Sequence, residues 1–223
     1  MNLDTVYKAL DTIESKTKAQ ADKLKASFDK KAKDVSEYEK TFANESKDNL
    51  VRNAESKFKN ARNNFRNTCN DIVKTECEKI REFLKRAYSA PITSEHINFL
   101  NALQLRNKVN KGDIEAAKLT LADSPMSMLS FRDLVERIDK EMLYFVPEVP
   151  SLQIALDALD DYENGRYNAI NNYLNVPDGT SSVSLSVELE DPFSLNPTNL
   201  RAAFIASTGR KKLENVIKPL DLV

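Results

Sequence analysis

Apolar residues in the first 90 positions recur at helical spacing, and no proline or glycine interrupts them before Pro91. Steps of three, four and seven residues place side chains on one face of an α-helix, and Pro and Gly cost most in a helix interior. Residues 1–90 are therefore predicted to form a long helical or coiled-coil arm. The apolar positions of its first part are Leu3, Val6, Leu10, Ile13, Ala21, Leu24, Phe28, Val35, Tyr38 and Phe42.

The second part of the arm is more regular and follows repeated steps of 4, 4 and 3 residues, with Glu76 as its only polar member. A repeat of this kind averages ~3.67 residues per turn, so its stripe runs nearly straight along a helix. We expect this packing stripe to bury its whole length against another helix or another copy of the chain. Its apolar members are Leu50, Ala54, Phe58, Ala61, Phe65, Cys69, Ile72, Ile80, Phe83 and Ala87.

The apolar pattern lapses over the polar residues 43–49. Leu50 follows Phe42 by eight residues, which puts it roughly 80° out of phase at about 100° per residue. The arm is therefore either one continuous rod or an antiparallel helical hairpin with arms 1–42 and 50–90. The near-equal arms favour the hairpin, because each could bury the stripe of the other. The absence of Gly and Pro at the turn keeps the rod open.

Beyond Pro91 the pattern changes to short amphipathic segments separated by glycines, prolines and residues that cap helices. Apolar positions at steps of three and four follow Thr93 or Ser94, Asp113, Ser130 and Ser151, which are residue types that begin helices. We expect residues 91–223 to form a small domain, a compact bundle of short helices.

One segment departs from the helical period. Residues 182–189 alternate strictly between polar and apolar side chains, which is the pattern of a half-buried β-strand. The chain offers no obvious partner strand. The first interpretation is an extended stretch lying on the bundle, and the second is a strand that pairs with another subunit or a partner protein. The predicted fold is thus mainly all-α with one isolated strand, whose apolar members are Val183, Leu185, Val187 and Leu189.

Charge separates the two parts of the chain. The formal net charge of the 223 residues is −1, but residues 1–90 carry +5 and residues 91–223 carry −6. Cations gather between residues 47 and 66, where they alternate with asparagines. Such a basic helix face could contact phosphates or an acidic protein partner. These candidate contact residues are Lys47, Arg52, Lys57, Lys59, Arg62 and Arg66.

Familiar catalytic arrangements are missing from the sequence. His96 is the only histidine, which excludes an HExxH zinc site and most Ser/His or Cys/His triads. We interpret it as an ordinary residue in the first turn of a helix. The four glycines are isolated, so neither a P-loop nor a GxGxxG turn can be built. The sequence therefore predicts neither an enzyme nor a bound cofactor.

One segment comes near a calcium-binding loop. Residues 160–171 place Asp, Asn and Gly at the first, fifth and sixth positions of the template, but Tyr162 and Asn171 stand where it needs carboxylate ligands. Calcium binding is not predicted. Asn164 and Gly165 are interpreted instead as the C-terminal stop of a helix.

These features favour a non-enzymatic assembly, scaffold or structural protein that acts through helical protein–protein contacts and self-association. A component of a large particle, such as a phage virion, would fit the pattern. The alternatives are a nucleic-acid-binding protein that uses the basic face 47–66, and a protein inhibitor or adaptor. The sequence contains no run of eighteen apolar residues and does not start with a signal-peptide pattern. We therefore expect no membrane contact and a location in the cytoplasm, or in a particle assembled there.

Overall fold

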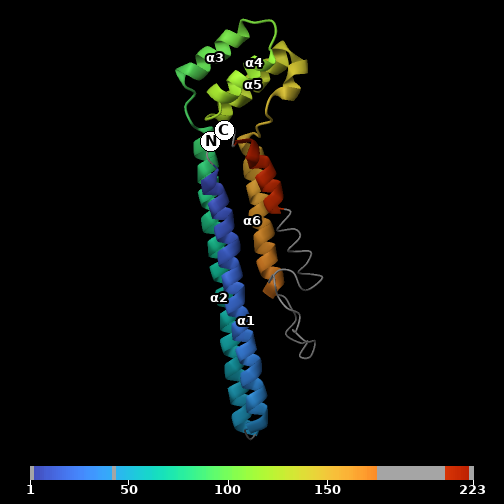
Figure 1. The fold of residues 1–223 in the computed structure, drawn as a ribbon. Helices are drawn as coiled ribbons and strands as arrows, with labels where there is room; N and C mark the ends of the chain where they lie inside the picture. The colour runs from blue at the N-terminus through green and yellow to red at the C-terminus, as the bar shows by residue number, and fades with distance from the viewer. Residues whose placement is uncertain (1–2, 42–43, 175–208, 221–223) are drawn as a thin grey trace. The chain divides into compact units, whose positions relative to one another are not determined.

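The computed structural model describes residues 3–41, 44–174 and 209–220, and every regular element among them is a helix. The prediction of an all-α fold is confirmed. The segment 182–189, predicted as a strand, lies outside the described residues. The elements (Figure 1) are α1 (Asp4–Thr41), α2 (Asn44–Tyr88), α3 (Ser94–Gln104), α4 (Lys111–Thr120), α5 (Pro125–Ile138), the 3-10 helix η1 (Lys140–Phe145), α6 (Leu152–Leu174), a helix over 209–217 and the 3-10 helix η2 (Lys218–Leu220).

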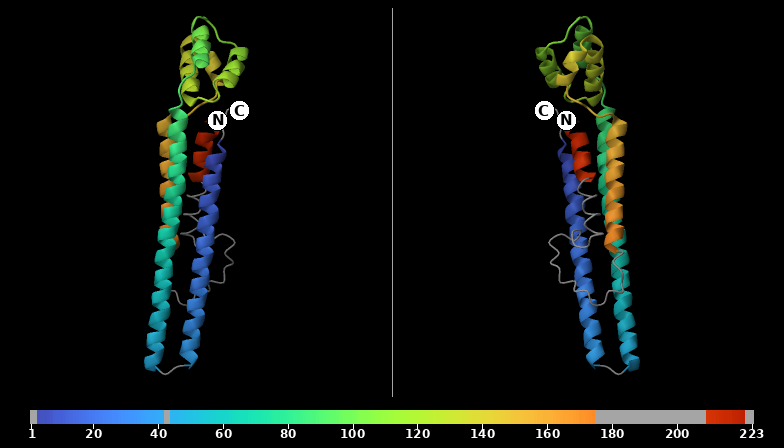
Figure 2. Two further views of the ribbon diagram at one scale, coloured as in Figure 1. Left: turned by 90° about the vertical axis from the view of Figure 1, so that its left-hand side faces the viewer. Right: turned by 90° about the vertical axis from the view of Figure 1, so that its right-hand side faces the viewer.

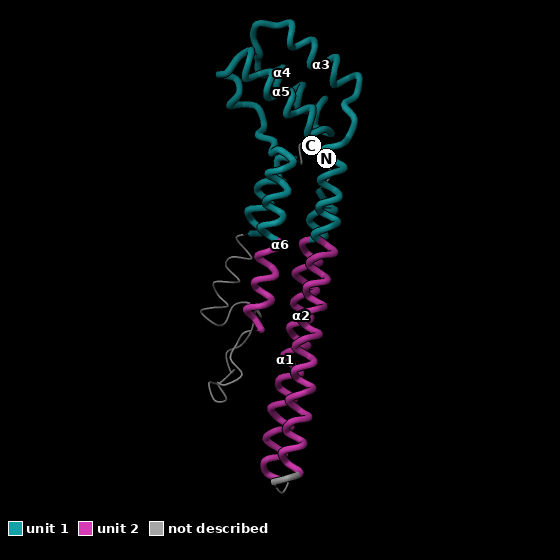
Figure 3. Tube along the Cα trace, turned by 180° about the vertical axis from the view of Figure 1, so that it is seen from behind, with its two compact units in different colours: residues 1–9, 77–162, 208–223 teal, residues 10–76, 163–207 magenta. Residues whose placement is uncertain are grey.

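The chain divides into two compact units (Figure 3). Unit 1 contains Met1–Ala9, Cys77–Tyr162 and Thr208–Val223, and unit 2 contains Leu10–Glu76 and Glu163–Ser207. Helices α1, α2 and α6 each contribute residues to both units. Each unit is thus assembled from segments far apart in the sequence. The predicted domain boundary after residue 90 stays a prediction.

Within unit 2, α1 and α2 lie side by side and antiparallel (Figure 2). The rings of Phe28 and Phe58 meet edge to face, with their centroids 5.5 Å apart. The pair is therefore a helical hairpin and not one rod. The turn predicted over 43–49 is too long, because α2 already begins at Asn44. Asp48 suits the first turns of a helix, where carboxylates interact favourably with the helix dipole. The coiled-coil geometry of the arm stays a prediction.

The C-terminal part of α6 supplies the third helix of unit 2. The Phe65 and Tyr173 rings lie 5.4 Å apart, and Arg166 donates a hydrogen bond of 3.2 Å to the hydroxyl of Thr17. Thr17 in turn donates to the carbonyl of Ile13, so its buried hydroxyl is satisfied. The buried apolar residues of this unit are Leu10, Ile13, Ala21, Leu24, Ala54, Phe65, Cys69, Val73, Ala169, Ile170 and Leu174.

The buried positions of α2 differ from the packing stripe beyond Cys69. Buried residues lie one position later at Val73, Cys77, Leu84 and Tyr88, and the stripe positions Glu76 and Ile80 are buried as well. Two neighbours explain the shift: α2 packs against α1 and also against α6, so its buried face lies between the two contacts. Other members of the stripe are half-buried, namely Leu50, Phe58, Ala61, Ile72, Phe83 and Ala87.

Unit 1 includes the short helices α3, α4 and α5 with η1, packed around a core that contains Phe131 and Met128. Thr93 caps α3 by accepting a hydrogen bond from the His96 backbone N–H. Asn110 caps α4 in a capping box. In this motif, two backbone N–H groups that have no partner inside the helix each donate a hydrogen bond to a side chain. Caps therefore fix where these helices begin.

Helix α5 begins earlier than the sequence pattern indicated. Ser124 is its N-cap, and Pro125 stands in its first turn, where the fixed φ of proline suits a helix and its missing N–H costs nothing. Ser130, predicted as the cap, lies one and a half turns inside the helix. That prediction is wrong because Pro125 and Ser124 together make the stronger start signal.

Helix α6 is continuous from Leu152 to Leu174, so the helix stop predicted at Asn164 and Gly165 is also wrong. A glycine in a helix interior costs only about 1 kcal/mol relative to alanine. Burial of Ala169 and Ile170 beyond it stabilises the helix by more than that, at ~0.8 kcal/mol per buried methylene.

Candidate interaction surfaces

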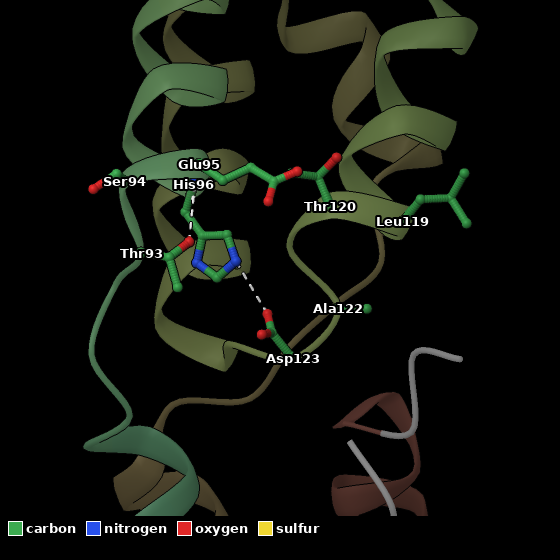
Figure 4. A pocket seen from close by; sticks show the side chains of 8 residues that line it. All are labelled: Thr93, Ser94, Glu95, His96, Leu119, Thr120, Ala122 and Asp123. Carbon is green, nitrogen blue, oxygen red and sulfur yellow. Dashed lines mark hydrogen bonds and ion pairs between the residues drawn. The ribbon is translucent and has the colours of Figure 1, made fainter.

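A shallow hollow in unit 1 brings His96 next to Asp123 (Figure 4). The Nε2 atom of His96 lies 3.1 Å from an Asp123 carboxylate oxygen, and its Nδ1 atom lies 3.0 Å from the Ser127 hydroxyl. A serine, a histidine and an aspartate thus lie next to one another, but the two ring nitrogens are exchanged relative to a hydrolase triad, in which Nε2 faces the serine and Nδ1 faces the aspartate. The hollow is lined by Thr93, Ser94, Glu95, His96, Leu119, Thr120, Ala122 and Asp123.

The burial of Ser127 argues against catalysis by this group. Ser127 is 0% exposed, and a nucleophile has to reach the substrate. Its hydroxyl also donates to the Ser124 hydroxyl at 2.9 Å, and its backbone N–H donates to the same oxygen. The network therefore joins the first turns of α3 and α5 and satisfies polar groups that are buried there. We interpret it as structural, in line with the interpretation of His96 from the sequence.

Large apolar side chains with high exposure are concentrated in one stretch of the chain. All of those found among the described residues lie between Ile92 and Ile154. Leu105, Leu119 and Tyr144 are 88%, 86% and 90% exposed, which is unusual for side chains of this size. We call these residues the exposed apolar set: Ile92, Ile97, Leu105, Leu119, Met126, Tyr144, Phe145 and Ile154.

Two aromatic members of this set are held by local contacts. The Tyr144 and Phe145 rings lie 5.6 Å apart, edge to face, and the Lys111 ammonium lies 4.8 Å from the centre of the Phe145 ring. A cation over an aromatic face is attracted by the ring quadrupole. The contact joins η1 to the start of α4 and leaves most of the Tyr144 side chain in solvent.

The candidate basic residues all lie on α2 in unit 2. Arg52, Lys57, Lys59 and Arg66 are exposed, and Lys47 is half-buried. Arg62 is half-buried too, and donates a hydrogen bond to the Leu174 carbonyl at the end of α6. A cation at this end of a helix is favourable, because the last carbonyls carry partial negative charge.

The structure adds a second basic segment that the sequence reasoning missed. Residues 16–33 of α1 contain seven lysines and only two aspartates, and the hairpin places them alongside the basic part of α2. Adding the charges of the two segments would have revealed this second basic segment. There is a reason to add them only if α1 and α2 form a hairpin, which brings the two segments together. The apolar strand residues Val183, Leu185, Val187 and Leu189 lie outside the described residues.

Two buried ionisable side chains, Cys69 and Tyr88, have pKa values raised by burial. Burial raises the pKa of the Cys69 thiol to about 12, with Arg166 acting in the opposite direction, so the thiol is protonated at neutral pH and is a poor nucleophile. Burial also raises the pKa of Tyr88 to about 12. The Tyr88 hydroxyl donates to the Pro150 carbonyl, which joins α2 to the residue before α6. Residues 3–41, 44–174 and 209–220 contain no cluster of three or more His, Cys, Asp or Glu side chains that could hold a metal ion.

Comparisons of the chain with models of protein families, with curated proteins and with solved structures gave no match. Within the part of the chain that the structure describes, no helix combines the length and the apolar character needed to span a bilayer.

Proposed function

We propose that the protein is a non-enzymatic assembly or scaffold protein that associates with other copies of itself through the exposed apolar set. The observation that carries this proposal is the concentration of exposed large apolar side chains between residues 92 and 154. Scattered exposed apolar residues are ordinary on a protein surface, whereas apolar residues that meet one partner together are typical of a protein contact, and we propose that this set does so. The described parts of α1 and α2 contribute none.

Charge is compatible with contact between copies at this surface. Residues 92–154 contain 7 lysines and arginines and 9 aspartates and glutamates, a net charge of −2. Near-balanced charge keeps the repulsion between two like surfaces small. Burial of apolar area, at about 25 cal/mol per Å², is then the main driving force for association. Membership of a large particle such as a virion stays a prediction.

Sedimentation velocity over a range of concentrations tests the proposal on the full chain. We expect the native protein to associate, and the double variant Leu119→Asp/Tyr144→Asp to need at least a tenfold higher concentration for the same degree of association. Both side chains are almost fully exposed, so the substitutions leave the core intact. The reason for the shift is that a buried, unpaired carboxylate costs several kcal/mol in an interface.

The matched control is Asn107→Asp, which adds a carboxylate at another exposed position of the same stretch. It should associate like the native chain. A native protein that stays monomeric at every concentration, or a double variant that associates as well as the native chain, would contradict the proposal.

A further inference from the structure

The middle of the α1–α2 hairpin combines two basic segments that are distant in the sequence. Residues 16–33 and 49–66 together contain 12 lysines and arginines and 3 aspartates and glutamates, a net charge of +9. The Phe28–Phe58 contact of 5.5 Å lies between them, and the Lys31 ammonium lies 5.3 Å from the centre of the Phe58 ring. The two segments therefore form one surface, which we call the basic band.

Most of this charge is directed to solvent. Only Lys31 and Arg62 are half-buried, and the other ten cations are exposed. Several recur at intervals of seven residues, and such residues lie close to one line along a helix. Lys18 and Lys25 do so on α1, and Arg52, Lys59 and Arg66 do so on α2. The exposed cations are Lys16, Lys18, Lys23, Lys25, Lys30, Lys33, Arg52, Lys57, Lys59 and Arg66.

Several of the exposed side chains between these cations are amides. Asn53, Asn60, Asn63 and Asn64 are exposed on α2, and their amides can donate hydrogen bonds to phosphate oxygens. Large apolar residues of the band, such as Phe28 and Phe58, are half-buried against each other. The band thus offers charge and amide groups but no exposed aromatic ring on which a base could stack.

The charge of the band and its lack of exposed large apolar side chains favour one of three kinds of partner over the other two. A second copy of the same surface would be repelled, because each copy carries +9. An acidic amphipathic helix would need apolar positions in which to anchor its apolar face, and the band exposes no large apolar side chain. A regularly spaced polyanion needs only the cations and the amides.

We propose that the basic band binds the phosphodiester backbone of nucleic acid, with contributions from both α1 and α2 and without reading base sequence. Binding of this kind releases counterions from the nucleic acid and is therefore strongly weakened by salt. It is independent of the self-association proposed above, because it uses residues of unit 2, whereas the exposed apolar set lies in unit 1.

Fluorescence anisotropy with a labelled 30-base-pair DNA duplex of arbitrary sequence tests the inference on the full chain. We expect binding that does not change between duplexes of different sequence. The logarithm of the affinity should fall with the logarithm of salt concentration with a slope of about −4 to −5, the value for about five neutralised phosphates.

Charge reversal on each helix separately tests the joint surface. The α1 variant Lys18→Glu/Lys25→Glu and the α2 variant Arg52→Glu/Lys59→Glu should each lower the affinity at least tenfold and reduce the salt slope. The control Lys74→Glu/Lys211→Glu changes the net charge by the same amount at exposed positions outside the band and should lower the affinity less than threefold. The corresponding Lys→Gln and Arg→Gln variants, compared by thermal unfolding, separate loss of binding from loss of structure.

Four outcomes would overturn the inference: absence of binding at 50 mM salt, a slope near zero, equal losses in the band variants and the control, or polyglutamate competing as well as unlabelled duplex. The last result would indicate a site for acidic polypeptides. A variant of α1 that binds as tightly as the native chain would show that α2 acts alone.

Discussion

At the scale of single residues, the side chains that first suggest chemistry have structural roles. Both ring nitrogens of His96 have a polar neighbour, but its serine partner is fully buried in unit 1. Cys69 is fully buried between α1, α2 and α6 of unit 2 and is a free thiol. A buried thiol with a raised pKa acts on stability through the difference in its protonation between the folded and the unfolded chain.

Cys69 gives a prediction for alkaline pH. Its folded pKa of about 12 lies above its ordinary value of 9.0, so the unfolded chain loses this proton first as the pH rises. The stability that this thiol contributes is complete below pH 9 and is lost progressively between pH 9 and 12, by up to about 1.4 kcal/mol per pH unit. Urea denaturation at pH 8, 9 and 10 measures it.

The variant Cys69→Ala should lose less stability than the native chain between pH 9 and 10. Tyr88 titrates from a higher ordinary value, 10.0, so its contribution is lost later and does not obscure the comparison. Equal pH dependence in the two proteins would show that the Cys69 thiol ionises as readily in the folded chain as in the unfolded chain.

At the scale of helices, capping residues decide where an element begins when periodicity is ambiguous. The apolar spacing of residues 131–142 is satisfied whether α5 starts at Ser124 or at Ser130. In the structure Ser124 accepts the Ser127 N–H at 3.2 Å, whereas the Ser130 hydroxyl donates to the Met126 carbonyl inside the helix. Ser124 therefore acts as the N-cap of α5, whereas Ser130 is an interior residue of the helix.

Alanine substitution at each serine measures this difference. Ser124→Ala should lower the free energy of unfolding by about 1–2 kcal/mol, because it removes the N-cap. Ser130→Ala should be neutral or stabilising by up to ~0.5 kcal/mol, because alanine has the higher helix propensity. Chemical denaturation of both variants checks the assignment, and the reverse order would place the helix start at Ser130.

At the scale of the whole molecule, the two proposed surfaces have opposite properties. The exposed apolar set belongs to a stretch with a net charge of −2 and is suited to a like partner, whereas the basic band carries +9 and repels one. A chain with both surfaces could assemble with its own copies while holding nucleic acid. The two activities should then be separable by substitution.

A cross-test of the variants measures this separation. Leu119→Asp/Tyr144→Asp should associate poorly but bind duplex DNA within threefold of the native affinity, measured at protein concentrations at which the native chain is monomeric. Arg52→Glu/Lys59→Glu should show the reverse behaviour. If Leu119→Asp/Tyr144→Asp also loses DNA binding under these conditions, the two surfaces are coupled. The proposal that they act independently is then wrong.

Local regularities in the sequence determined the helical fold class, the break between α1 and α2 and the basic part of α2. Helical periodicity and the absence of Gly and Pro act over a few turns, so they can be read without knowing what lies next to the helix. Periodicity also identified four buried residues of the packing stripe, among them Phe65 and Cys69.

Only the tertiary structure decided which faces are buried and which charges combine. The shift from the packing stripe to Val73 and Cys77 depends on α6, which packs on α2 from nearly a hundred residues away in the chain. The basic band likewise exists only because the hairpin puts residues 16–33 beside residues 49–66. Packing and electrostatic interactions depend on distances in space. The order of residues in the sequence gives those distances only within a single helix, where the geometry is regular.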